Sequence, residues 1–171
     1  MTHPIKQSLK ILSLAGLITL VGCGSMGKIA PGTPLQSVVS QYGQPSVECQ
    51  NPNGTKRVVW TQEPAGEEAW AANVDASGGV SEFTQVLTAD QFTVLNQGSW
   101  TAERVNCQFG PPARIKTYPN NPNQFVWQYH YIGGGSSEFM LLSININKAS
   151  NRVAGYATGM DPELNPLISG P

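Results

Sequence analysis

Short helical patterns of apolar residues occur at two places in the chain. The first pattern places Leu35, Val38, Val39 and Tyr42 on one face of two helical turns. Thr33 and Pro34 precede it as N-cap and first helical residue, and Gly43 follows, so we expect a helix that ends at Gly43 with positive φ. The second pattern places Ala102, Val105 and Phe109 on one face and ends at Gly110. Both helices are too short to be stable alone, so each is expected to pack on a sheet.

Four strands are predicted after each helix, because runs of alternating or apolar residues are separated there by clusters of turn residues. After the first helix the strands are 46–50, 55–62, 68–75 and 80–87; after the second they are 113–118, 125–132, 138–147 and 152–158. Alternation is clearest in the strand that carries Phe125, Trp127, Tyr129 and Tyr131 on one face. Each helix with its strands is therefore expected to form an α+β unit, with short helices covering one face of an antiparallel meander.

The two units match each other residue by residue. Landmarks of the first unit and their counterparts are Met26 with Phe92, Ile29 with Leu95, Gly32 with Gly98, Thr33 with Ser99, Val38 with Val105, Tyr42 with Phe109, Gly43 with Gly110 and Pro45 with Pro112. The register continues into Val59-Trp60 and Val126-Trp127, which are 67 residues apart. We therefore predict two tandem repeats, residues 26–88 and 89–159. Residues 160–171 lack periodicity and contain three prolines, so this tail is predicted to be disordered.

The first 22 residues have the pattern of a secretory signal peptide. Lys6 and Lys10 precede an apolar run of 11 residues, 11–21. That run is too short to cross a bilayer as a helix, for which about 20 apolar residues are needed. A small residue then precedes Cys23, where cleavage is expected.

The end of this segment, Leu-Val-Gly-Cys at residues 20–23, resembles the lipobox of bacterial lipoproteins. The resemblance implies cleavage before Cys23 and attachment of a diacylglyceryl group to its thiol, with residues 23–25 as lipidated anchor and linker. Gly24 stands where an aspartate would retain such a protein in the inner membrane, which implies the outer membrane, on its periplasmic face. The alternative is an ordinary signal peptide with Cys23 as a free thiol.

Composition excludes several classes of function. Without residues 1–22, eight basic and eleven acidic side chains remain, a net charge of about −3 with no basic run, so no nucleic-acid partner is expected. His130 is the one histidine of this mature chain, and no cluster with metal-ligand spacing accompanies it. We therefore expect no metal, no other cofactor and no catalytic residue, with His130 at the surface or as a satisfied core residue.

Two cysteines remain besides Cys23. Cys49 lies on the first predicted strand of the first repeat, and Cys107 lies on the helix of the second. An even number of thiols in an oxidising compartment favours a disulfide, which would link the repeats and close a loop worth about 4 kcal/mol. The alternative is two buried free thiols, because the sequence does not supply the Cα separation that a disulfide requires.

A motif shared by both repeats resembles that of a known family. It reads Phe or Met, then Ile or Leu, then Gly-Ser or Gly-Thr, followed by an aliphatic-faced helix ending in aromatic-Gly-x-Pro and a strand with Val-Trp. This pattern, over 26–87 and 92–158, resembles the BamE (SmpA/OmlA) family, small outer-membrane lipoproteins of the β-barrel assembly machinery. BamE has a single such unit. A tandem pair is similar to the β-lactamase-inhibitor-protein architecture, in which two copies form a concave sheet that grips a partner protein.

Five aromatic residues are candidates for a partner-binding surface: Trp60, Trp70, Trp127, Tyr129 and Tyr131. Aromatic residues are enriched at binding hot spots, but strand aromatics also pack in cores under helices. The favoured expectation is a non-catalytic adaptor of the BamE-like kind, anchored in the membrane through Cys23 and bound to envelope proteins such as the β-barrel assembly machinery. The alternative is a protein inhibitor or ligand-binding module that uses a concave aromatic sheet.

Overall fold

The structure of this protein, a computed structural model, describes residues 25–133 and 138–164. The described chain forms two four-stranded antiparallel sheets and several short helices, so the predicted α+β class is confirmed. The predicted signal peptide 1–22, the lipidation site Cys23 and residues 165–171 of the tail lie outside the described residues.

The chain runs through the two sheets in turn. The first sheet, of order β1-β2-β3-β4, comprises β1 (Val47–Gln50), β2 (Lys56–Thr61), β3 (Ala69–Val74) and β4 (Thr84–Gln85), and it follows η1 (Met26–Lys28, a 3-10 helix) and α1 (Leu35–Tyr42). The second sheet, of order β5-β6-β7-β8, comprises β5 (Arg114–Tyr118), β6 (Asn121–Ile132), β7 (Phe139–Asn147) and β8 (Arg152–Met160), and it follows α2 (Ala89–Phe92), η2 (Thr93–Asn96, a 3-10 helix) and α3 (Ala102–Phe109). Most strands follow the predicted ranges closely, whereas β4 is shorter and β6 begins earlier.

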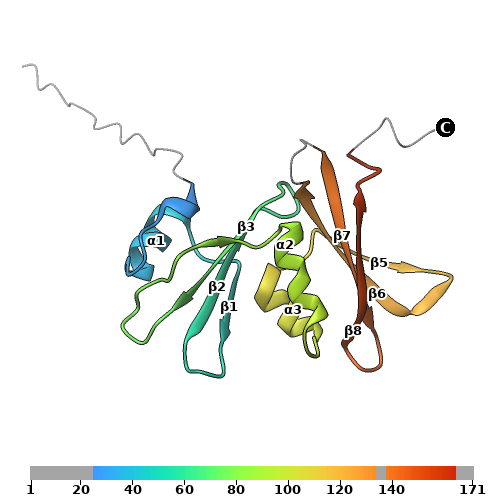
Figure 1. Ribbon diagram of the computed structural model, residues 1–171, viewed down its shortest axis with the longest axis horizontal. Coiled ribbons are helices and arrows are strands. Elements are labelled where there is room, and N and C mark those ends of the chain that lie inside the picture. Colours follow the sequence, from blue (N-terminus) through green and yellow to red (C-terminus); the bar gives the residue numbers. More distant parts are fainter. Residues whose placement is uncertain (1–24, 134–137, 165–171) are drawn as a thin grey trace, which may run out of the picture.

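The elements form four layers: α1, the first sheet, the α2–α3 segment and the second sheet (Figure 1). One hydrophobic core joins the last three layers. In it Val105 and Phe109 of α3 are fully buried together with Val59 of β2 and Tyr129 of β6. The α3 helix therefore packs on both sheets, which holds the two halves of the chain together.

Helices cover both faces of the first sheet, whereas one covered face was predicted for each sheet. The consecutive residues Val58, Val59 and Trp60 of β2 are all buried. Val58 and Trp60 pack in a second core with Val38 of α1, while Val59 faces α3. A strand covered on both faces forms a continuous apolar run, which explains why alternation is weak in β2.

The first helix begins one residue later than predicted. Pro34, rather than Thr33, is the N-cap, because Pro34 has extended backbone and forms an isolated bridge with Gly79. The Thr33 carbonyl accepts a hydrogen bond from the Val80 amide. Val80 also forms a bridge with Val74 of β3, so residues 79–80 connect the start of α1 with the end of β3. The strand β4 itself is Thr84–Gln85, shorter than the predicted strand 80–87.

The disorder predicted for residues 160–171 is wrong at its beginning. Met160 ends β8, and Asp161 is fully buried, with its amide donating to the Phe139 carbonyl. The Asp161 carboxylate lies within ion-pair distance of His130 and Arg114. Asp161 is buried because charged residues surround it. A search for hydrophobic periodicity does not detect a polar residue that is buried for this reason.

Gly43 and Gly110 end α1 and α3 with φ of 80° and 85°, so the predicted positive φ is confirmed. Their ψ values are −177° and −176°, which differ from the left-handed helical values expected for such a position. The chain leaves each helix directly into extended backbone. Only glycine adopts this combination readily, and another residue costs about 1–3 kcal/mol.

We expect Gly110→Ala to lower the free energy of unfolding by about 2 kcal/mol and Gly43→Ala to lower it by less. A Cβ at Gly110 would lie 3.3 Å from Cβ of Thr61, whereas at Gly43 nothing lies within 4 Å. Alanine would have the same backbone strain at both positions. The difference between the two losses of unfolding free energy therefore measures the steric contribution of Thr61. Urea unfolding of the two variants provides the measurement, and a larger loss at Gly43 would contradict the expectation.

Candidate functional site

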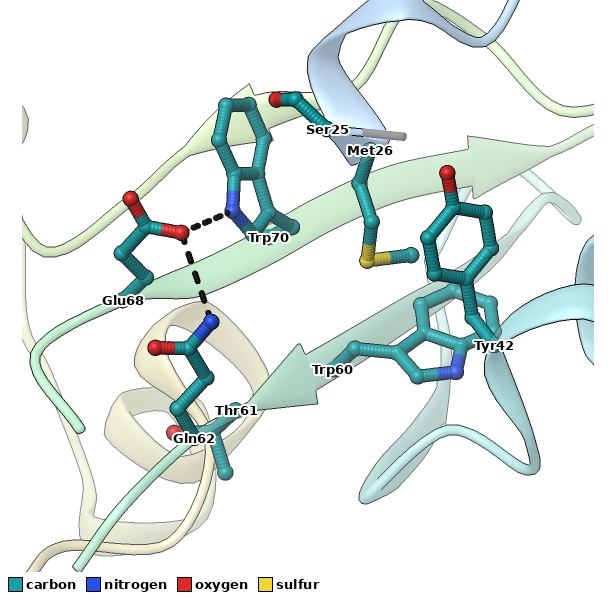
Figure 2. A pocket seen from close by; sticks show the side chains of 8 residues that line it. All are labelled: Ser25, Met26, Tyr42, Trp60, Thr61, Gln62, Glu68 and Trp70. Carbon is teal, nitrogen blue, oxygen red and sulfur yellow. Dashed lines mark hydrogen bonds between the residues drawn. The ribbon is translucent and has the colours of Figure 1, made fainter. Parts of the chain in front are cut away.

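An open pocket of about 350 Å³ lies beside η1, on the face of the first sheet where Trp60 packs with α1. Trp60 of β2 and Trp70 of β3 lie directly opposite each other in the sheet, so their side chains share a face. Tyr42 comes from the last turn of α1 and Met26 from η1 (Figure 2). The pocket therefore joins aromatic residues from two strands and one helix.

The walls of this aromatic pocket differ in how firmly they are held. Trp60 is 8% exposed, and its Nε1 donates to the carbonyl of Gly43 at 2.9 Å. Trp70 is half-buried, and its Nε1 donates to Oε2 of Glu68 at 3.0 Å (Figure 2). The backbone of Gly27 lies against the Trp70 ring, because a Cβ there would approach it to 2.9 Å. Trp60 is fixed as a core residue, while Trp70 is held at the rim.

Glu68 gives the pocket a negative rim. Its Oε2 also accepts a hydrogen bond from Nε2 of Gln62 at 3.4 Å. Aromatic walls beside a carboxylate suit a group with an apolar body and a positive end, such as a lysine or arginine side chain or a small organic cation. The described pocket can thus bind a ligand or a side chain of a partner protein.

The five aromatic residues predicted for partner binding do not form one surface. Tyr129 is fully buried and Tyr131 is 3% exposed, both in the core under α3, so a binding role for these two is wrong. The Tyr129 hydroxyl donates to the carbonyl of Gly110 at 3.0 Å. Trp127 is half-buried and borders a separate shallow hollow beside Phe125. Trp60 and Trp70 are the two that meet in one pocket.

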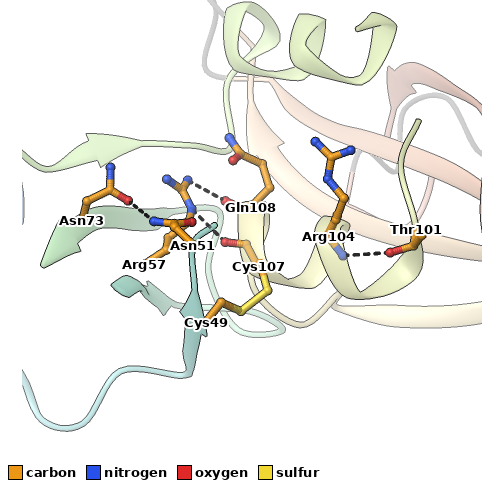
Figure 3. Close-up of a disulfide and its surroundings, with 8 residues drawn as sticks. All are labelled: Cys49, Asn51, Arg57, Asn73, Thr101, Arg104, Cys107 and Gln108. Atoms are coloured by element: carbon orange, nitrogen blue, oxygen red, sulfur yellow. Dashed lines mark hydrogen bonds between the residues drawn. A yellow bond between two sulfur atoms is a disulfide. The ribbon is translucent and has the colours of Figure 1, made fainter. Parts of the chain in front are cut away.

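A disulfide joins the two halves of the chain. Cys49 of β1 and Cys107 of α3 are bonded, with Cα atoms 5.9 Å apart (Figure 3). Beside it, Nε of Arg57 donates to the carbonyl of Cys107 at 2.8 Å, and a second guanidinium nitrogen donates to the carbonyl of Gln108 at 3.2 Å. These carbonyls end α3, where a positive charge is favourable. Burial lowers the pKa of the Arg57 guanidinium below its usual range.

A buried ionic cluster lies between the two halves, and no pattern in the sequence predicts it. Nδ1 of His130 lies 3.0 Å from Oε2 of Glu63, and Nε2 lies 3.2 Å from Oδ2 of Asp161. Glu63 comes from the connection between β2 and β3, and its carboxylate also accepts the backbone amide of His130. Arg114 lies 3.5 Å from Asp161 and 2.6 Å from Glu163. Of the two alternatives, His130 is thus a core residue, with Nδ1 hydrogen-bonded to Glu63 and Nε2 within ion-pair distance of Asp161 but without a hydrogen bond of good geometry in the described residues.

The His130 cluster has the character of a structural site. The Glu63 side chain is 1% exposed and the Asp161 side chain is fully buried. Both ring nitrogens of His130 face carboxylates, so neither is directed at the aromatic pocket or at a nucleophile. Glu63 and Asp161 lie outside the periodic segments, and their pairing depends on two distant parts of the chain. A sequence pattern therefore provides no signal for them.

We expect the free energy of unfolding to fall as the pH rises from about 4.5, and Glu63→Gln to remove part of this fall. Burial raises the pKa of Glu63 above its usual 4.5, against the opposing effect of His130. The folded protein then binds a proton at pH values where the unfolded chain has released it. Urea unfolding between pH 4 and 7 measures the slope, with exposed Glu82→Gln as the control. Equal slopes in all three proteins would contradict the expectation.

Comparison with protein-family models, curated proteins and solved structures finds no match to this chain. Among residues 25–133 and 138–164, no group of histidine, cysteine and acidic residues is arranged to hold a metal ion. No helix within the same ranges is long and apolar enough to cross a membrane.

Proposed function

We propose that this protein is a non-catalytic lipoprotein of the outer membrane that faces the periplasm and acts as a BamE-like adaptor in outer-membrane protein assembly or envelope integrity. The observation that carries the proposal is the lipobox-like sequence at residues 20–23, placed directly after an 11-residue apolar run. The disulfide between Cys49 and Cys107 supports an oxidising compartment such as the periplasm.

We also infer that the two halves of the chain are tandem repeats. Two features support this inference. Each long helix ends at a glycine of positive φ, Gly43 or Gly110, and is followed by a four-stranded antiparallel meander. The carbonyl of each glycine accepts a hydrogen bond from an aromatic residue of the second strand, Trp60 or Tyr129. A similar joint between helix and sheet thus occurs in both halves, although the donor of the second half lies two residues beyond Trp127, the counterpart of Trp60.

The aromatic pocket supports a role at the membrane surface. Ser25 lines the pocket and follows Cys23 by two residues, which span about 7 Å at most. A lipid on Cys23 would place this pocket close to the bilayer. The partner it meets there is then a membrane protein or a protein held at the membrane, and Glu68 favours a lysine or arginine side chain on that partner.

The second candidate function is an inhibitor or ligand-binding module. The observation that favours it is the combination of Trp60, Trp70 and Glu68 in one pocket, which suits a soluble ligand as well as a partner side chain. The burial of Tyr129 and Tyr131 weighs against a concave aromatic sheet surface. The two functions therefore differ in what occupies the same pocket.

Replacement of Cys23 tests the anchor. We expect the wild-type chain to take up labelled palmitate and to fractionate with outer membranes, and Cys23→Ser to do neither. Cys49→Ser serves as the control, because it removes a thiol without touching the lipobox. Palmitate uptake by Cys23→Ser, or its absence from the wild-type chain, would overturn the anchor.

Cross-linked purification of the native lipoprotein from cell envelopes tests the partner. We expect components of the β-barrel assembly machinery to be recovered with the wild-type chain, and recovery to fall when Trp70→Ala and Glu68→Gln are combined. Trp127→Ala is the matched control, because it removes a half-buried tryptophan from the other sheet. Specific capture of a soluble periplasmic enzyme, lost only in the pocket variant, would contradict the adaptor function and support the inhibitor function.

A further inference from the structure

The two sheets have four edge strands, and three of them are poorly suited to pair with another chain. An exposed edge presents unpaired backbone groups, which proteins usually protect by short strands, charges or bulges. In the first sheet β1 has four residues and carries the disulfide, and β4 has two. In the second sheet β5 carries Arg114 and Lys116, and its pairing shifts between Lys116 and Tyr118. The remaining edge, β8, has nine residues.

The first part of β8 is covered by its own chain. The Val153 amide donates to the carbonyl of Trp100, and Thr101 forms a bridge with Arg152. Beyond a register shift in the pairing with β7, the run from Gly155 to Met160 contains no charged residue and no proline. Ala157 to Met160 are all exposed. We call this run, Gly155–Met160, the β8 edge.

The direction of the backbone groups follows from the pairing with β7. The Asp161 amide donates to the carbonyl of Phe139 on β7, so the backbone of Asp161 faces β7. Direction alternates along an antiparallel strand, so the amides and carbonyls of Tyr156, Thr158 and Met160 point away from β7. Among residues 25–133 and 138–164, no backbone group forms a hydrogen bond with these outward amides and carbonyls. They form a regular row that another strand can pair with.

The small residues between Tyr156, Thr158 and Met160 leave space on the outer face of the second sheet, the face opposite to the core under α3. Gly155, Ala157 and Gly159 lie on that face, and a Cβ at either glycine would meet nothing within 4 Å. A shallow hollow of about 220 Å³ lies there, with Leu141 and Ala157 in its lining. A large apolar side chain on a neighbouring strand can cover such glycines and fill the hollow.

The small side chains of the β8 edge also bear on what occupies it. In antiparallel pairing, residues directly opposite each other share a face. Two copies of this edge would therefore set glycine and alanine against glycine and alanine, and the hollow would stay empty. A strand with large apolar or aromatic residues at alternate positions would fill it. Charge on that strand is disfavoured, because Gly155 to Met160 supply no counter-charge.

We propose that the β8 edge binds an extended, uncharged segment of a partner protein as a fifth strand of the second sheet, with an aromatic side chain seated over Gly159 and Leu141. Backbone hydrogen bonds to Tyr156, Thr158 and Met160 supply affinity, and the hollow supplies the preference for an aromatic residue. The proposal uses a different face from the aromatic pocket and stands whether or not the chain is a membrane-anchored adaptor.

Binding of a defined peptide tests the proposal. The probe is a short, capped peptide in which threonine alternates with tryptophan, phenylalanine and tyrosine, and its control has the same composition without alternation. We expect the full-length protein in detergent, with empty micelles as blank, to bind the alternating peptide more tightly. Hydrogen exchange is expected to slow at the outward amides of Thr158 and Met160. Equal binding of both peptides, or unchanged exchange at these amides, would overturn the proposal.

Substitutions on the β8 edge distinguish peptide binding through backbone hydrogen bonds from non-specific hydrophobic binding. Thr158→Pro removes one outward amide while leaving the hydrogen bonds to β7, and Thr158→Val keeps the amide. We expect Thr158→Pro to weaken peptide binding by about tenfold or more and Thr158→Val to leave it nearly unchanged. Ala157→Lys, which keeps the backbone and places a charge beside the hollow, is expected to weaken binding similarly. If Thr158→Pro fails to fold, Ala157→Lys decides, and full binding by a folded Ala157→Lys overturns the proposal.

Sedimentation of the full-length protein separates a partner strand from a second copy. We expect its oligomeric state to be the same for the wild-type chain and Ala157→Lys. A dimer that dissociates on Ala157→Lys would show that a second copy occupies the β8 edge, and the proposed partner strand would then be wrong.

Discussion

Replacing both Cys49 and Cys107 with serine is expected to lower the free energy of unfolding by about 4 kcal/mol. The disulfide joins residues separated by 58 positions, and a cross-link over so long a loop removes much conformational freedom from the unfolded chain. Urea unfolding provides the measurement. The wild-type chain under reducing conditions is expected to match the double variant, and the variant is expected to be insensitive to reductant.

The double variant is expected to keep its fold in the absence of denaturant. Val59 and Phe109, from the two halves, remain buried in one core, and Arg57 still donates to the α3 carbonyls of Cys107 and Gln108. The cross-link therefore adds stability to an interface that packing has already formed. An unchanged urea midpoint in the double variant would contradict the prediction, and a loss of near-ultraviolet circular dichroism without urea would show that packing alone does not hold the halves.

His130→Ala is expected to lower the free energy of unfolding at neutral pH by about 3 kcal/mol, because a buried carboxylate that loses its hydrogen-bond partner is left with its desolvation cost. The substitution leaves the carboxylates of Glu63 and Asp161 buried without the ring nitrogens that face them. His130→Gln is expected to cost less, because its amide can still donate to one carboxylate. Urea unfolding of both variants gives the comparison.

A double-mutant cycle and the pH dependence identify the cause of this loss. If the cost comes from an uncompensated carboxylate, Glu63→Gln is expected to cost less in the His130→Ala protein than in the wild-type chain. The cost of His130→Ala is also expected to shrink below pH 4.5, since burial raises the pKa of Glu63 and the neutral acid needs no counter-charge. Additive losses that do not vary with pH would show that lost packing, not charge, is responsible.

The regular elements were largely predictable from local patterns. Alternation along 125–132 and 138–147 predicted β6 and β7, and the stop signals at Gly43 and Gly110 predicted the helix ends. These features depend on residues that are neighbours in the chain, because side-chain direction in a strand and the φ of a glycine are local properties. The start of α1 and the length of β4 were less accurate, because Pro34 forms a bridge with Gly79 and Val80 forms hydrogen bonds to the distant backbone of residues 32–33.

The candidate sites were predictable only in part. The sequence names Trp60 and Trp70, but only their pairing across β2 and β3 places them in one pocket with Tyr42. Tyr129 has the same alternation as an exposed aromatic residue and is nevertheless buried, because α3 lies over its face of the sheet. Period-two patterns identify the two faces of a strand without stating which one another layer will cover.

The sequence by itself determined the α+β class, the order of helices and strands and the glycine turns, because these depend on periodicity and backbone preference within short segments. The tertiary structure alone decided that α3 packs between the two sheets and that Cys49 reaches Cys107. It also decided that Glu63 and Asp161 meet at His130. Burial of these polar groups is favourable only when partners from distant parts of the chain lie next to them, and a local sequence pattern contains no information about such contacts.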